Sequence, residues 1–260
     1  MMGYCIHLDL SQELPGGDFR NSLSKLYDDA WQIASDVMNT DGDQVDINVN
    51  SSATSTNYIK ARFEDNGEAY NFIDISLEDA SMYLNKNRFR SRQLVIMDSP
   101  GEIYLMERLI HESIHALCDQ KISDLNSYDE SVAEGIAQAG SYIGLVKYYN
   151  YGDRQEVYNY VSNWVAHHLI AANMMGLLEK YSVDEIKLPD DLDLPEFNLN
   201  FIQKQLDWAR KYQGILKKIN GDYLRKFRTY TEGFLRVVDE MNHGKSLRDI
   251  AMQPGGMPDE

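Results

Sequence analysis

Apolar side chains recur at two different spacings along the first part of the chain. Between residues 18 and 39 they return every three or four positions, which predicts an amphipathic helix. The segment 44–50 alternates apolar and polar residues and predicts a half-buried strand. Two more alternating segments, separated by the turn sequence Asp-Asn-Gly, predict a hairpin over 58–76. These strands lean toward an antiparallel arrangement, and the pattern of 77–92 is mixed.

A short strand and a long helix are expected in the middle of the chain. Residues 93–98 form an apolar run that predicts the strand. Ser99 is the expected N-cap of a helix running from about Pro100 to about Gln120. Proline suits a first helical turn, and Glu102 stands three residues after the cap, which would complete a capping box.

The apolar spacing becomes helical almost throughout after residue 120. It predicts helices over 129–149, 154–181, 198–219 and 222–242. An acidic, proline-containing connection precedes the last two of these helices. The sequence therefore predicts an α+β protein with two lobes and a tail. The expected divisions are a strand-containing lobe over 1–120, an all-helical lobe over 121–252 and a disordered tail over 253–260.

Length and charge limit the partners that this chain is expected to have. Its 260 residues are enough to bury a sizeable core. The net charge of −16 repels phosphate backbones and anionic lipid, so neither nucleic acid nor a membrane is an expected partner. Cys5 and Cys118 do not form a disulfide framework, and no signal peptide or run of ~18 apolar residues is seen. The expected location is the cytoplasm.

The sequence RLIHESIHAL, residues 108–117, carries the strongest chemical signal. On a helix, His111 and His115 lie one turn apart on one face and aim their rings at a common point. Zinc accepts histidine nitrogens at ~2.0–2.1 Å, usually in tetrahedral geometry. Glu112 is rotated by ~100° from the first histidine. It would therefore stand beside the metal, where it can take a proton from a zinc-bound water.

A catalytic zinc ion needs a third protein ligand and an open position. The next predicted helix offers Glu134, 18 residues after His115. Glu130, one turn earlier, is a rival on the same face, although acidic residues are also favourable in any first helical turn. Gly135 would let two helices approach closely beside the metal. Glu130 or Gln138 could accept or donate a hydrogen bond at a histidine ligand's second ring nitrogen, and surface polarity explains them equally well.

The motif HESIH, followed by 18 residues and then Ala-Glu-Gly-Ile-Ala, resembles the gluzincin metallopeptidases. The match is tight over about 99–140 and is similar to the aminopeptidase-type domains, although their Gly-x-Met-Glu-Asn motif is absent. The resemblance implies a zincin-like fold with one Zn²⁺ per chain. It assigns the metal to His111, His115 and Glu134 and the role of base to Glu112.

The resemblance also implies that a tyrosine or histidine from the helical lobe stabilises the oxyanion of the reaction. Tyr230 is the first candidate, because its helix is similar to the closing helix of compact gluzincin domains. Tyr142, two turns after Glu134, is the second. His167 and His168 are further candidates, although a core or surface role is the simpler interpretation of both.

These features predict a zinc metallopeptidase that acts on a peptide or protein substrate. Glu112 would deprotonate the zinc-bound water and pass the proton to the leaving amine. The substrate is expected to lie extended along the edge of the small sheet. Two alternatives remain: a zinc hydrolase of a non-peptide amide or ester, and a non-catalytic zincin-like binding domain.

Overall fold

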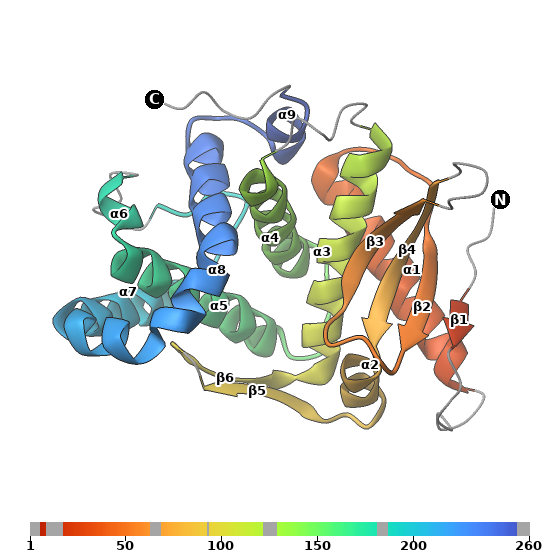
Figure 1. The fold of residues 1–260 in the computed structure, drawn as a ribbon, viewed down its shortest axis with the longest axis horizontal. Helices are drawn as coiled ribbons and strands as arrows, with labels where there is room; N and C mark the ends of the chain where they lie inside the picture. The colour runs from red at the N-terminus through yellow and green to blue at the C-terminus, as the bar shows by residue number, and fades with distance from the viewer. Residues whose placement is uncertain are drawn as a thin grey trace.

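The computed structural model describes residues 6–8, 18–62, 69–92, 94–121, 129–180 and 187–253. The architecture is α+β and mostly helical, with its strands near the N-terminus (Figure 1). The predicted tail falls outside the described residues except for Gln253, and so does Cys5.

A four-stranded sheet forms one side of the molecule (Figure 1). Its strands, in spatial order, are β1 (Ile6–Leu8), β2 (Asp46–Asn50), β4 (Ala69–Ser76) and β3 (Asn57–Arg62). The predicted hairpin is confirmed, since β3 and β4 are antiparallel with Tyr58 opposite Ile73. The antiparallel leaning is wrong for the rest of the sheet, because β1 pairs with β2 and β2 with β4 in parallel.

Helix α1 (Asp18–Met38) explains the parallel pairing of the first two strands. Helix α1 follows β1, a strand that was not predicted. It provides the crossover connection that parallel neighbouring strands need. Its apolar face packs against α3 (Gly101–Lys121). Ile47 and Ile73 of the sheet are fully buried in the same core as Leu23 of α1.

The mixed segment 77–92 contains helix α2 (Leu77–Leu84) and strand β5 (Arg88–Arg92). Strand β5 pairs with β6 (Ile96–Pro100), which begins three residues later and ends two residues later than the predicted strand. The predicted capping box is therefore wrong. Ser99 sits in β6 opposite Phe89, and Glu102 accepts a hydrogen bond from Tyr149. Strand pairing takes Ser99 and Pro100 away from the helix, which begins at Gly101.

Every element described after residue 129 is helical, as predicted. The elements are α4 (Glu130–Lys147), α5 (Arg154–Met175), α6 (Leu177–Lys180), α7 (Glu196–Lys211), α8 (Gln213–Asn242) and α9 (Leu247–Ala251). The helix predicted over 154–181 breaks at Gly176, whose φ of 75° is left-handed and suits glycine.

The last two predicted helices divide at a different place. Helix α7 ends and α8 begins on either side of Tyr212. At the predicted boundary near residue 220, helix α8 continues and is only kinked at Asn220, with φ −108° and ψ 15°. None of the helices in the described parts of the chain is both long and apolar enough to cross a bilayer.

Candidate metal centre

Helix α3 brings the two motif histidines together on the face that looks toward α4. The Nε2 atoms of His111 and His115 are 3.2 Å apart, and their rings meet edge to face. His111 is 1% exposed, so its ring is held by packing. Two imidazole lone pairs at this distance repel each other unless a proton or a cation lies between them.

Glu134 of α4 completes a triangle with the two histidines. Its Oε2 atom is 3.2 Å from Nε2 of His111 and 3.6 Å from Nε2 of His115. Two ligands ~2.0–2.1 Å from one tetrahedral zinc ion are about 3.3–3.4 Å apart. The three donor atoms therefore have the spacing and the N, N, O chemistry that zinc accepts.

The charges of this triangle are strongly coupled. Burial alone would raise the pKa of Glu134, but hydrogen bonds with His111 and His115 hold it far below its usual range. Burial would lower the pKa of His115, but the hydrogen bond and the charge of Glu134 raise it. The ionised state of Glu134 is the one that a metal ion requires, whereas a proton on His115 occupies the place that a metal ion would take.

The start of α4 explains why Glu134 and not Glu130 faces the histidines. Asp129 caps the helix by accepting a hydrogen bond from the Ser131 amide, and Arg236 of α8 donates to the Asp129 carboxylate. Glu130 is then exposed in the first turn and is not part of the triangle.

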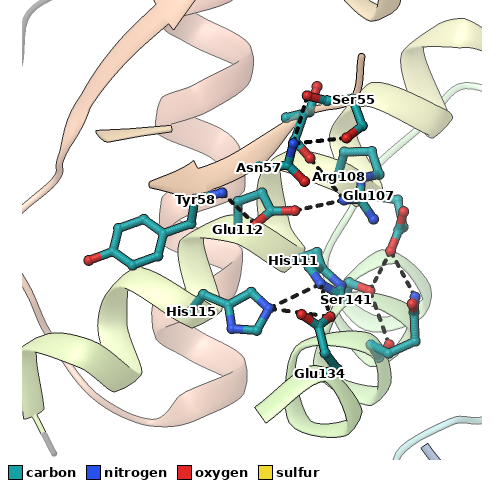
Figure 2. A network of polar contacts seen from close by, with 12 residues as sticks. Ser55, Asn57, Tyr58, Glu107, Arg108, His111, Glu112, His115, Glu134 and Ser141 are labelled. Carbon is teal, nitrogen blue, oxygen red and sulfur yellow. Dashed lines mark hydrogen bonds and ion pairs between the residues drawn. The ribbon is translucent and has the colours of Figure 1, made fainter. Parts of the chain in front are cut away.

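Glu112 lies beside the triangle, on the side of the sheet (Figure 2). Its Oε2 accepts a 2.7 Å hydrogen bond from the backbone N–H of Tyr58 in β3. Its Oε1 accepts a 2.7 Å hydrogen bond from Arg108, one turn earlier on α3. A carboxylate has about four lone-pair positions, so these two bonds fix Glu112 and leave it able to accept another proton donor.

Arg108 joins the helix to the sheet at this point. The same Nη2 atom that contacts Glu112 also donates to the backbone carbonyl of Thr56, at 2.9 Å. Further along α3, Asp119 accepts a 2.9 Å hydrogen bond from the Tyr58 hydroxyl. Strand β3 is at the edge of the sheet. Thr56 O and Tyr58 N–H at this edge are therefore already bonded to α3.

A second carboxylate, Glu107, is buried one turn before His111 on α3 (Figure 2). It accepts hydrogen bonds from Gln138, Ser141 and Tyr160. The expectation that Gln138 could bond a histidine ligand is wrong: its amide N–H donates to Glu107, and no hydrogen bond joins Gln138 to a histidine among the described residues. The Nδ1 atom of His111 has no partner among the described residues.

Tyr230 of α8 reaches the same site. A close contact between α4 and α8 places it there: a Cβ built on Gly135 would overlap the carbonyl oxygen of Gly233. Gly135 therefore permits the approach of α8, not of α3 as the sequence suggested. Burial raises the pKa of Tyr230, and the charge of Glu134 adds to the effect, so its hydroxyl keeps its proton.

The assembled groups line a cavity of about 170 Å³. Its walls are Asn57, Tyr58, Arg108, His111, Glu112, His115, Glu134 and Tyr230. All five predicted site residues are among them. The sequence did not single out Asn57, Tyr58 or Arg108. Only Arg108 left a signal, because it stands four residues before Glu112 and an i, i+4 pair of opposite charges can form there.

The other candidates point elsewhere. The Tyr142 hydroxyl is bonded to Nε2 of His168, and both residues are fully buried away from the cavity. His167 is bonded to the hydroxyl of Tyr223 at 2.8 Å, and burial lowers the pKa of His167 to about 3. Burial raises the pKa of the Cys118 thiol to about 12, as expected for a small core residue and not for a ligand.

Comparisons with models of protein families, with curated proteins and with solved structures find no match to this chain. The resemblance to gluzincins thus stays a prediction that rests on the motif and its spacing.

Proposed function

We propose that this chain is a zinc-dependent metallopeptidase with a zincin-like arrangement of its two lobes. One observation carries the proposal: Nε2 of His111, Nε2 of His115 and Oε2 of Glu134 are 3.2, 3.2 and 3.6 Å apart. The order of the elements supports it as well, because the edge strand β3 precedes the motif helix α3, and α4 with the third ligand is the next helix after α3.

His111, His115 and Glu134 would hold the metal. A zinc ion bound there lowers the pKa of a coordinated water to ~7 and polarises a carbonyl group. Glu112 is the base: it accepts the proton of the attacking water and passes it to the leaving amine. Tyr230 keeps its phenolic proton and can donate it as a hydrogen bond to the oxyanion.

A specific observation keeps a second function in view. Two backbone groups at the edge of β3, Thr56 O and Tyr58 N–H, are already bonded to α3. The cavity is small and lined by polar side chains and tyrosines. An extended peptide would have fewer edge groups to pair with than the sequence suggested, which favours a small amide or ester as the alternative substrate.

Metal content tests the proposal directly. Wild-type protein dialysed with zinc and then freed of excess metal should hold about one zinc per chain, and His115→Ala and Glu134→Ala should hold none. Glu130→Ala and His243→Ala are matched controls, because both side chains are exposed and outside the triangle. The assignment would be overturned if wild-type protein bound no zinc after this treatment, or if Glu134→Ala kept the full zinc content.

Glu112→Gln separates catalysis from binding. The amide keeps the size of the side chain but cannot act as the base. We expect full zinc content and a loss of peptide cleavage of at least ~100-fold. Cleavage of small ester or amide substrates, with none of a peptide library, would favour the second function. Zinc binding without any hydrolysis would favour a non-catalytic domain.

A further inference from the structure

Exposed hydrophobic side chains gather at one end of the molecule. Eight large hydrophobic side chains are exposed among the described residues, and five of them lie between 197 and 215. These five are Phe197, Leu199, Trp208, Tyr212 and Ile215. They lie on α7, at Tyr212 between α7 and α8, and at the start of α8, at the end of the molecule opposite the sheet (Figure 1). Such a concentration differs from the scattered apolar residues of an ordinary surface.

Helix α7 has an inner and an outer face. Ile202, Leu206 and Ala209 are buried against the rest of the lobe. Lys204, Trp208 and Lys211 follow one another at helical spacing on the other face. The side chains of all three are exposed. The outer face therefore alternates aromatic and basic residues.

The charge of this end is opposite to that of the whole molecule. Residues 204–218 hold five basic residues and one acidic residue, a net charge of +4. Since the chain carries −16, the remainder carries −16 − 4 = −20. The expectation that anionic surfaces repel this protein rests on its net charge, but residues 204–218 form a positively charged segment within an acidic chain.

The basic residues are available to a partner. Arg210 is 3.5 Å from Asp207, whereas Lys204, Lys217 and Lys218 form no ion pair with another described residue. The Trp208 and Tyr212 rings are 5.5 Å apart, and Lys211 lies over the Tyr212 ring. Lys204, Trp208 and Lys211 share one face of α7, and the exposed Tyr212, Ile215 and Lys218 follow directly in the chain. We call these six residues the basic–aromatic surface.

We propose that the basic–aromatic surface docks on an anionic phospholipid bilayer. Lysine and arginine are attracted to its negative headgroups, and tryptophan and tyrosine favour the boundary between headgroups and acyl chains. Ile215 distinguishes a bilayer from a nucleic acid, because an aliphatic side chain that is 62% exposed neither stacks on bases nor pairs with phosphate. The acidic remainder is repelled by the same membrane and orients the basic end toward it.

Trp208 provides a spectroscopic test on the full chain. Trp31 is 6% exposed and the ring N–H of Trp164 is buried, so Trp208 is the tryptophan that a bilayer would contact. Vesicles of phosphatidylcholine with phosphatidylserine should shift its fluorescence to the blue, and co-sedimentation should show binding that salt weakens. Pure phosphatidylcholine vesicles should do neither. Trp208→Phe should lose the shift but still sediment with the anionic vesicles.

Substitutions then assign the binding to this surface. Each basic charge removed should weaken partitioning about fivefold, so Lys211→Gln with Lys218→Gln should weaken it about 25-fold. Ile215→Ser should also weaken it. The matched control is Lys25→Gln with Lys86→Gln, two exposed lysines outside the surface, which should bind like wild type.

Three results would overturn the proposal. The first is an absence of binding to the anionic vesicles. The second is equal weakening in the control pair, which would indicate a general charge effect. The third is binding to poly(U) or to an acidic protein that is lost on charge removal but unaffected by Ile215→Ser, which would assign the surface to a different polyanion.

Discussion

Gly135 of α4 and Gly233 of α8 pack backbone against backbone, with no room for a side chain on either. Glu134 is the neighbour of the first glycine, and Tyr230 stands one turn before the second. The contact between the two glycines therefore sets the distance between Glu134, the candidate third metal ligand, and Tyr230.

Gly135→Ala should damage both stability and the site. The added methyl group must push α8 away, and such overpacking costs about 1–3 kcal/mol. Urea unfolding should show the loss in the free energy of unfolding, and hydrolysis should fall because Tyr230 moves. Gly214→Ala is the control: its new methyl group would point into open space, so stability should be unchanged or slightly higher. Equal effects of the two substitutions would mean that the close contact does not matter.

Tyr230→Phe tests the oxyanion role without changing the size of the ring. Removing a donor of this kind costs about 100-fold or more in kcat, while zinc content and Tm should stay as in wild type. Tyr223→Phe on the same helix is the control, because the Tyr223 hydroxyl bonds His167 outside the cavity. Should Tyr230→Phe keep full activity, another donor must be sought.

Arg108→Met should leave the buried carboxylate of Glu112 without its cation. The Glu112 side chain is 5% exposed and that of Arg108 18%, so the loss should be about 3 kcal/mol in the free energy of unfolding. Adding Glu112→Gln should recover most of it, since a neutral amide needs no cation. The double variant measured beside both single ones gives the coupling. Additive losses would contradict the pairing.

His167 makes stability depend on pH. Burial lowers its pKa to about 3 in the folded protein, below the ordinary value of 6.5. Between pH 6.5 and pH 3, His167 binds a proton in the unfolded chain but stays neutral in the folded protein. The contribution of neutral His167 to the free energy of unfolding is therefore fully present above pH 6.5. It falls by up to about 1.4 kcal/mol per pH unit as the pH is lowered to 3. Urea unfolding of His167→Gln between pH 7 and pH 4 should show a shallower fall than wild type. Parallel curves would show that His167 titrates normally.

The helices predicted over 18–39, 100–120 and 129–149 and the hairpin over 58–76 are confirmed, because each follows a local rule of spacing. Ser99 shows where such a rule fails: it has the sequence of a helix cap, but pairing with β5 draws it into a strand. Strand β1 alternates as Ile-His-Leu but is only three residues long, too short for a spacing rule to predict it. Its parallel pairing with β2 requires the crossover through α1, which no local pattern shows.

The candidate site shows the same division. The spacing of a helix already places His111 and His115 together, so local sequence is enough. The contact of Glu112 with Tyr58 could not be predicted, because the donor is a backbone N–H and any residue except proline offers one. Gly135 predicts a close approach of two helices, but its partner on α8 depends on how three helices pack.

The bond between Tyr58 and Glu112 has a second consequence. Strand β3 is the edge of the sheet, and an open edge invites pairing with another chain and aggregation. Helix α3 covers part of this edge with Arg108 and Glu112, so the proposed base and the arginine that holds it also protect the sheet. Substitutions that break the bond between Glu112 and the Tyr58 N–H leave that edge group unpaired, and should therefore make the protein more prone to self-association in concentrated solution.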